Sequence, residues 1–154
     1  MEAKQIALAV ALIVSGLVVT GTAQTGTAAS ADAAQARSAK YYSALQSGDF
    51  SSAWGFFGSR MRADTSRDEY VTRAKQGIKS VRVVHAPRVS SVTKTSPRPM
   101  ATIRTDIVIV GLNGDEESIT QTTEWLWQRS PDTGTDDWFL ARDVVGPSRP
   151  AGTK

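Results

Sequence analysis

The chain has 154 residues, of which 40% are hydrophobic and 21% are charged, a composition typical of one globular domain rather than a disordered or collagen-like chain. It contains no cysteine and one histidine, which excludes disulfides, zinc ribbons, iron–sulfur sites and thiol nucleophiles. We therefore expect neither a metal site nor a cofactor. Eighteen basic against fifteen acidic residues give a net charge of +3, which is too small by itself to indicate nucleic-acid binding.

An apolar run near the N-terminus predicts export. Residues Ile6–Val19 are almost wholly apolar and follow Lys4, which is the layout of a secretory signal, and small residues then allow cleavage after Ala23 or Ala29. An uncleaved membrane anchor is the alternative, because the run approaches the roughly 20 residues that a membrane helix requires. Residues 1–29 are thus predicted to be a signal peptide or an anchor. Either would place the domain in the periplasm, the cell envelope or the extracellular space.

Composition also divides the remainder of the chain. Residues 30–36 are small, polar and low in complexity, and we expect a linker there. Residues 37–145 form the predicted domain. Residues 146–154 hold two prolines and two glycines and are predicted to be a disordered tail.

Helical periodicity begins at Arg37. Apolar residues recur at spacings of three and four on both sides of the Ser47-Gly48-Asp49 break, which predicts two helices with a tight turn between them. Glycine suits the C-terminal end of the first helix, and aspartate can cap the second. A third helix is expected to start at Ser66, where Ser66 and Glu69 form a capping box, and to end near Gly77.

Strands are predicted after Gly77, because valine, isoleucine and threonine become frequent and the apolar period falls to two. Asn113-Gly114 predicts a close hairpin. In the longest strand, Ile103, Ile107 and Ile109 lie on one face, while Arg104 and Asp106 lie on the other. The expected strands are Ile78–His85, Arg88–Lys94, Met100–Val110, Ile119–Arg129 and Trp138–Val145.

Helices followed by a run of antiparallel strands predict an α+β domain, in which N-terminal helices pack on one face of a curved sheet. Three segments resemble the nuclear-transport-factor-2-like superfamily: Tyr41–Trp54, Ser66–Tyr70 and Asp137–Leu140. The resemblance implies a half-barrel that can leave a pocket at its open end. It also implies a homodimer through the outer face of the sheet. The superfamily includes isomerases and dehydratases as well as domains that only bind or assemble, so the resemblance sets no reaction.

Two residues are candidates for acid–base chemistry. His85 is the only imidazole and would need an orienting carboxylate to act as a base; the alternative is a histidine at the rim that makes one hydrogen bond. Asp106 would be a usable base if it were buried in the interior, because burial raises a carboxyl pKa. Alternation along the strand instead favours an ion pair on the outer face, since Asp106 shares that face with Arg104.

Large aromatic side chains supply candidates for a ligand pocket, because such sites are lined mainly by apolar walls. A domain of this size also needs large side chains to fill its core, so a purely structural role is the alternative for each. The five candidates are Tyr42, Trp54, Phe57, Trp125 and Trp127.

Charge is unevenly distributed along the chain. Residues 60–104 carry eleven basic and three acidic side chains, whereas residues 105–143 carry two basic and nine acidic ones. This pattern favours an electrostatic interface with an anionic partner, unless basic and acidic strands are neighbours and pair across the sheet. Nucleic acid is not expected, because the basic segment offers only Tyr70 for stacking on bases.

These observations favour an exported, non-enzymatic domain that works by binding a protein partner or a second copy of itself through the outer sheet face. The alternative is a small apolar-ligand pocket protein, or an isomerase-like or dehydratase-like enzyme that uses the interior. Contact with a membrane is expected only through the N-terminal segment, if that segment stays uncleaved.

Overall fold

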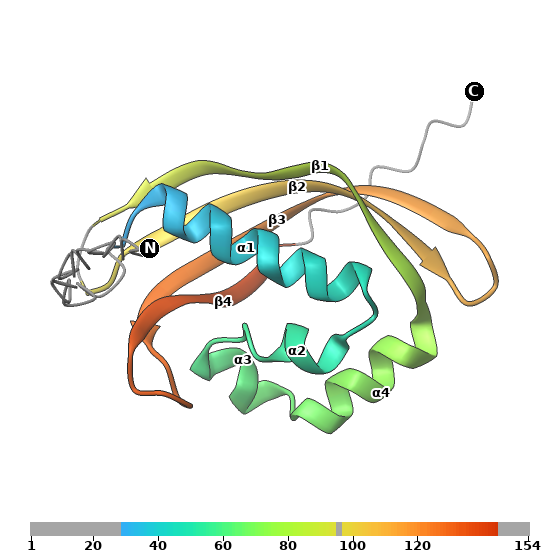
Figure 1. Cartoon of the computed structure of the whole chain (residues 1–154), viewed down its shortest axis with the longest axis horizontal. Helices are drawn as coiled ribbons and strands as arrows, with labels where there is room; N and C mark the ends of the chain where they lie inside the picture. Colours follow the sequence, from blue (N-terminus) through green and yellow to red (C-terminus); the bar gives the residue numbers. More distant parts are fainter. Residues whose placement is uncertain (1–28, 95–96, 145–154) are drawn as a thin grey trace, which may run out of the picture.

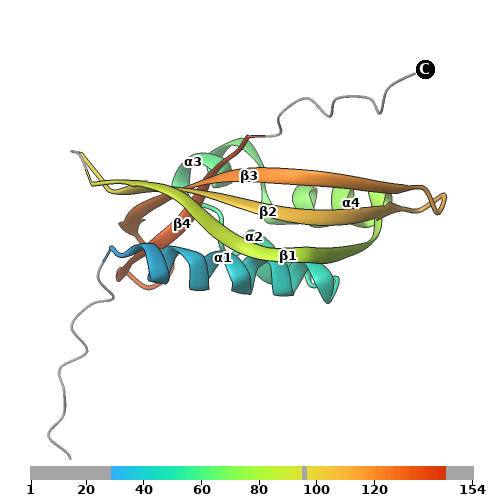
Figure 2. The same cartoon turned by 90° about the horizontal axis from the view of Figure 1, so that it is seen from above.

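The computed structural model describes residues 29–94 and 97–144. This part of the chain forms an α+β domain, as predicted, with helices packed against an open antiparallel sheet whose strands follow the order β1-β2-β3-β4. All the helices lie on one side of the curved sheet, which leaves its outer face uncovered over most of its length (Figures 1 and 2). The elements are α1 (Ala31–Gln46), α2 (Phe50–Trp54), α3 (Ser59–Asp64), α4 (Arg67–Gly77), β1 (Ile78–Thr93), β2 (Met100–Gly111), β3 (Glu116–Arg129) and β4 (Asp136–Val144).

The first helix starts earlier than its apolar periodicity predicts. Helix α1 begins at Ala31, so residues 30–36 are not a linker. The Ser30 hydroxyl accepts a hydrogen bond from the Ala33 amide at 3.1 Å, and Ala34 is completely buried. The low complexity of this segment comes largely from alanine, which has the highest helix propensity of all residues. Given a cap and a contact with the core, such a segment folds.

The predicted caps at Gly48, Asp49 and Ser66 are confirmed, whereas the second half of the predicted capping box is not, because the Glu69 carboxylate pairs with Arg73 instead of reaching back to Ser66. Gly48 ends the turn after α1 with a φ of +71°, a left-handed conformation that glycine adopts without strain. The Asp49 carboxylate accepts from the Ser52 amide at 2.9 Å and so caps α2. The Ser66 hydroxyl caps α4 by accepting from the Glu69 amide at 3.3 Å. The short helix α3 was not expected from the sequence.

The strands differ from prediction at β1. One continuous strand replaces the two expected segments, and the Ala86-Pro87 dipeptide lies within it. The register with β2 shifts between Val83 and His85 and again between His85 and Arg88. Because β1 is an edge strand, the proline's missing N–H removes no hydrogen bond from the sheet interior. The proline therefore produces an irregularity in the register of β1 and does not end the strand.

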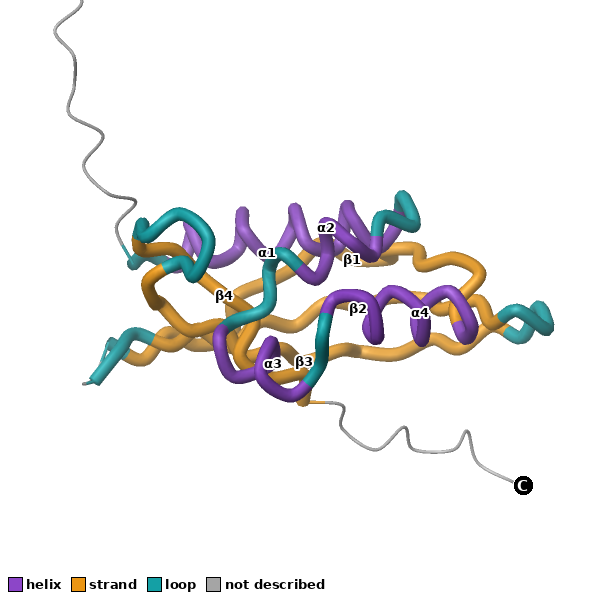
Figure 3. Tube along the Cα trace, turned by 90° about the horizontal axis from the view of Figure 1, so that it is seen from below, coloured by secondary structure: helices purple, strands orange, loops and turns teal. Residues whose placement is uncertain are grey.

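The core lies between the helices and the inner face of the sheet. Ile103 and Ile107 are 0% and 2% exposed, and Ile109 is partly buried against the same cluster, so the predicted apolar face of β2 is confirmed. Figure 3 shows the helices lying across this face of the strands. The Asn113-Gly114 hairpin also forms as predicted between β2 and β3, with Gly114 at a φ of +89°.

Two predictions fall outside the described residues: the apolar export segment Ile6–Val19 and the tail 146–154. Within residues 29–94 and 97–144, no helix has the length and apolar character needed to cross a membrane.

Candidate functional site

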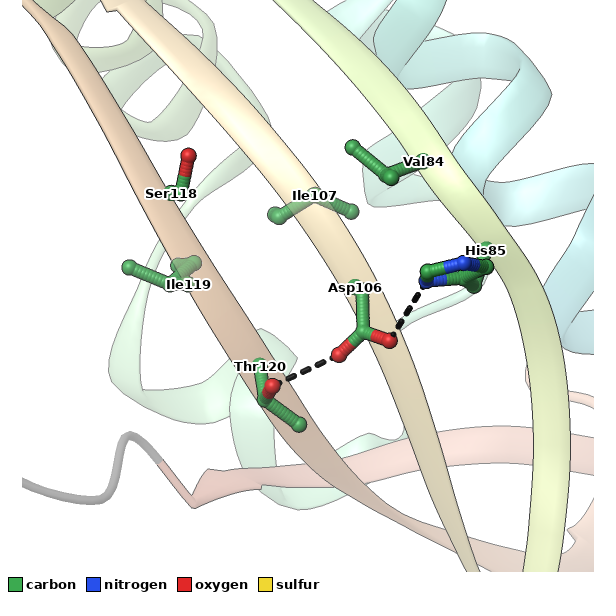
Figure 4. Close-up of a pocket in the computed structure, with 7 residues that line it drawn as sticks. All are labelled: Val84, His85, Asp106, Ile107, Ser118, Ile119 and Thr120. Atoms are coloured by element: carbon green, nitrogen blue, oxygen red, sulfur yellow. Dashed lines mark hydrogen bonds and ion pairs between the residues drawn. The ribbon is translucent and has the colours of Figure 1, made fainter.

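A polar cluster lies on the outer face of the sheet, the face turned away from the helices. The His85 Nδ1 atom lies 2.9 Å from Asp106 Oδ2, and the Thr120 hydroxyl donates to Asp106 Oδ1 at 2.6 Å (Figure 4). The Arg88 guanidinium forms an ion pair with the same carboxylate at 3.5 Å. We call these four residues the His85 cluster. The structure thus brings together both residues that the sequence nominates for acid–base chemistry.

Strand register assembles this cluster from three strands. Asp106 lies directly opposite His85 on β1 and directly opposite Thr120 on β3. Sequence reasoning missed Thr120, because a two-residue turn at Asn113-Gly114 would place position 121 opposite position 106. The turn that forms has three residues, with the Gly111 N–H donating to the Asp115 carbonyl, and this places position 120 opposite position 106 instead. The pairing with His85 could not be found either, since it depends on the irregular register of β1.

The environment of Asp106 favours its ionised form. The hydrogen bond from Thr120 lowers the pKa of Asp106, and the hydrogen bond and charge of His85 and the charge of Arg88 lower it further. The His85 side chain is 63% exposed, and the Asp106 side chain is 30% exposed. A base buried in the interior would have a raised pKa, so Asp106 does not have the environment that the enzyme alternative requires. The cluster is suited to hydrogen bonding and ion pairing at a wet surface.

The His85 cluster borders an open hollow of about 350 Å³. Val84, which is 52% exposed, adds an apolar side chain at its rim (Figure 4). A contacting surface would therefore meet one imidazole, one carboxylate, hydroxyls and a small apolar patch. The lining residues are Val84, His85, Asp106, Ile107, Ser118, Ile119 and Thr120.

Charges on neighbouring strands pair across the outer face. Arg142 makes two hydrogen bonds to Glu124, at 3.0 and 2.7 Å, and Arg82 lies 3.9 Å from Glu116. Basic and acidic side chains therefore lie next to each other at these positions of the outer face, and their charges offset each other.

The charge of Arg104 is not neutralised by such a pair. Arg104 lies directly opposite Arg88 in the register, and within the described residues it has no ion pair. Like charges directly opposite each other on a sheet destabilise the pairing. Since Asp106 already contacts His85, Arg88 and Thr120, an excess of positive charge remains around Arg104.

The five aromatic candidates do not line the hollow. Tyr42, Phe57 and Trp125 are buried in the core. Trp54 is partly buried: its indole N–H donates to the Thr65 carbonyl at 3.2 Å, and the Arg62 guanidinium lies 4.3 Å from its ring centroid. Trp127, also partly buried, packs edge-to-face on Trp138. Each of these contacts holds elements of the fold together.

Comparisons with known proteins identify no family. No family model matches the chain, and no curated protein matches it. A SEC-C motif containing protein from Psychrobacter arcticus has a similar solved structure, with a TM-score of 0.50 and 16% identity over 77% of this chain and 63% of that one. A SEC-C motif containing protein from Rhodopseudomonas palustris gives a TM-score of 0.48 and 14% identity over 76% of this chain and 81% of that one. At such identities the likeness concerns the fold alone, and this chain spans less than two thirds of the Psychrobacter protein.

These comparisons correct the resemblance drawn from the sequence. The similar Psychrobacter structure is a SEC-C motif containing protein, which is a different family from the nuclear-transport-factor-2-like superfamily, so that assignment is wrong. The matching segments form a capped break between helices, a capped helix start and part of a strand. Such local features serve many α+β domains. A half-barrel is not confirmed either, because the described sheet is open.

Proposed function

We propose that the chain is an exported, non-enzymatic binding domain that holds an acidic segment of a protein partner on the outer face of its sheet. The observation that carries this proposal is the excess positive charge of the opposed Arg104 and Arg88, beside His85 and an open hollow with the exposed Val84 at its rim. A carboxylate from a partner would relieve the repulsion between the two opposed arginines. The apolar run at Ile6–Val19 supports export.

The proposal does not extend to a proton-transfer enzyme or to an apolar-ligand pocket built from the five aromatic candidates. General acid–base catalysis is most effective when the pKa of the catalytic group lies near the working pH, whereas the surroundings of Asp106 lower its pKa. Both His85 and Asp106 are also reached by water, which weakens every electrostatic interaction that they make.

A peptide titration tests the proposal. Labelled hexaglutamate, with hexaglutamine as the uncharged control, is titrated with the full chain at low ionic strength and followed by fluorescence anisotropy. We expect saturable binding of hexaglutamate alone. We also expect Arg104→Gln to weaken it about tenfold, the equivalent of about 1.4 kcal/mol. Arg129→Gln is the matched control, because it removes the same charge from a pair with Asp136 at the far end of β3.

The results of these experiments distinguish a partner protein from a second copy of the chain as the molecule bound at Arg104. Equal loss in both arginine variants would reduce the effect to net charge and contradict a site at Arg104. Sedimentation of the full chain supplies the other arm: a dimer that dissociates in the Arg104→Gln variant would identify a second copy of the chain as the occupant.

A further inference from the structure

A second hollow lies at the edge of the outer face of the sheet, where α3 begins beside β4 (Figure 1). Its volume is about 390 Å³, which is within the range of small-molecule sites, and it is more enclosed than the hollow at the His85 cluster. We call it the Arg60 hollow. It is formed by residues of β2, β3 and β4 and of the segment that leads into α3.

Three apolar side chains line the Arg60 hollow. Met100 and Leu126 lie directly opposite each other on β2 and β3, and both are partly buried but lie outside the aromatic core. Ala141 adds a third from a bulge in β4, because Leu140 and Arg142 pair with consecutive residues of β3 and leave Ala141 without a partner in that strand. Bulges are frequent next to active sites, where they redirect side chains. The hollow thus offers apolar contact that the core does not use.

A glycine forms the opposite wall of the hollow. The Gly58 N–H donates to the Leu140 carbonyl at 2.8 Å, which holds the segment before α3 against the edge of β4. A Cβ atom at position 58 would lie 3.2 Å from the Leu140 oxygen and 3.3 Å from Gln128 Nε2. Glycine therefore allows a close approach that a side chain would hinder, and it brings Arg60 to the hollow.

Two polar groups at the hollow lack partners among the described residues. Arg60 is exposed and forms no ion pair with these residues, whereas Arg62 on the same helix binds both oxygens of Asp132. Gln128 is only 7% exposed and donates to the Ser59 hydroxyl at 3.3 Å, but its side-chain carbonyl accepts no hydrogen bond from them. Since buried polar groups normally have a partner, this carbonyl is available to a donor from a ligand.

The charge of the hollow favours an anion. Glu124 also lines it, but its carboxylate is held by two hydrogen bonds from Arg142, at 3.0 and 2.7 Å. These two charges offset each other, so the positive charge of Arg60 is in excess. A guanidinium binds a carboxylate through charge-assisted hydrogen bonds.

We infer that the Arg60 hollow binds a small carboxylate with an apolar body and an N–H group, which is the chemistry of an N-acylated apolar amino acid. The carboxylate would pair with the Arg60 guanidinium, and the N–H would donate to the Gln128 side-chain carbonyl. The apolar body would contact Met100, Leu126 and Ala141. The Arg60 hollow shares no lining residue with the hollow at the His85 cluster and does not include Arg104, so this inference is independent of the acidic partner proposed above.

A ¹H–¹⁵N NMR titration of the full chain at neutral pH tests the inference. The probes are N-acetylleucine, N-acetylleucinamide, which has the same apolar body without the charge, and N-acetylglycine, which has the charge without the apolar side chain. We expect saturable binding of N-acetylleucine, with shifts at Gly58, Ser59 and the Gln128 side-chain amide. The other two probes should bind about fivefold more weakly or undetectably.

Two arginine variants test the charge. Arg60→Gln should weaken the binding of N-acetylleucine about tenfold, and because Arg60 is exposed and unpaired within the described residues, this variant should fold normally. Arg73→Gln is the matched control, since it removes the same charge from an exposed position on α4 and should leave the affinity unchanged. Far-ultraviolet circular dichroism checks that both variants are folded.

Four results would overturn the inference: no saturable binding of N-acetylleucine, equal affinity for N-acetylleucinamide, equal loss in the two arginine variants, or shifts confined to residues around Arg104 and His85. The last result would assign the carboxylate to the site proposed for an acidic partner. It therefore distinguishes a failure of this inference from a failure of that proposal.

Discussion

Two aspartates on opposite faces of the same sheet have pKa values shifted in opposite directions, so residue type alone does not determine their chemistry. Asp106 accepts from Thr120 and lies beside Arg88 and His85, so its pKa is lowered. Asp143 is desolvated by surrounding protein and meets only an uncharged amide, so its pKa is raised. The first stabilises the fold as a carboxylate, and the second destabilises it in that form.

Replacing Asp143 by asparagine should therefore stabilise the protein at neutral pH. The pKa of Asp143 in the folded state lies above the value of about 3.9 for the unfolded chain. Below that unfolded value both states bind the proton and the carboxyl has no effect. As the pH rises through the pKa of the folded state, deprotonation costs the folded state more than the unfolded state. The melting temperature of Asp143→Asn should thus exceed that of the parent at about pH 7 and converge with it at about pH 3.

Asp106→Asn is the control for this experiment, since it is expected to change the melting temperature in the opposite direction. The pKa of Asp106 is lowered in the folded state, so this residue contributes stability above the unfolded value and loses it as the pH falls through the folded value. The variant should melt below the parent at neutral pH. If both variants melt above the parent, the environment assigned to Asp106 is wrong, and if both melt below it, the environment assigned to Asp143 is wrong.

Arg62 provides a residue-scale test of packing. Its guanidinium binds both oxygens of Asp132 at 3.0 and 2.9 Å and donates to the carbonyls of Gly55 and Phe57 at 2.9 and 2.8 Å. Because the Arg62 side chain is only 11% exposed, Arg62→Ala leaves these two carbonyls without their donor and should cost about 2 kcal/mol or more. Arg73→Ala, which breaks an exposed pair with Glu69 on α4, should cost less than about 0.5 kcal/mol. Urea unfolding measures both, and equal costs would contradict the central role of Arg62.

At the scale of the element, the start of α1 gives the clearest test. Ala36 is exposed and lies in a segment that the composition assigns to a linker but the structure assigns to the helix. In a helix, Ala36→Gly should lower the free energy of unfolding by about 1 kcal/mol, because glycine loses more backbone freedom and has no favourable contact there. Ala36→Lys keeps a good helix former and should change stability by less than about 0.5 kcal/mol. If Ala36→Gly leaves the free energy of unfolding in urea unchanged, this result would favour the predicted linker over the helix.

Elements that depend on local signals were predictable, and those that depend on tertiary contacts were not. The caps at Asp49 and Ser66 and the Asn113-Gly114 turn act over three or four residues, so the sequence contains all the information that they need. The continuity of β1 through Pro87 depends on its place at the edge of the sheet. Helix α3 contains no buried residue and has no side-chain cap, which explains why no pattern indicated it.

The same distinction applies to the candidate sites. His85 and Asp106 were nominated by residue type, and their contact follows from a strand register that includes two irregularities. Gln121 and Asp143 were missed because their contact depends on the register between β3 and β4, which includes a shift that the sequence does not indicate. Their importance comes from the hydrogen bond between them and from the tyrosines of α1 and α4, which only the folded chain brings together.

At the scale of the whole molecule, the sheet separates two kinds of surface. Its outer face is polar and carries several ion pairs. Its inner face holds the aromatic core and the hydrogen-bonded pair Gln121 and Asp143.

The start of the mature chain follows from how the first described residues pack. Export predicts cleavage after Ala23 or Ala29, and both sites satisfy the requirement for small residues. Ala29, however, is partly buried against the core, and Ser30 caps α1. Cleavage after Ala29 would remove that contact and place an ammonium group on the cap, where a positive charge opposes the helix dipole.

We therefore predict that, if the chain is exported as proposed, the mature protein begins at Gln24. Intact-mass measurement and N-terminal sequencing of the protein recovered from the exporting cell check this directly. As the matched comparison in solution, a chain beginning at Ser30 should be less stable to urea than one beginning at Gln24, by about 0.5 kcal/mol or more at neutral pH. Recovery of a chain that begins at Ser30 would contradict the packing argument. An intact Met1 would contradict cleavage.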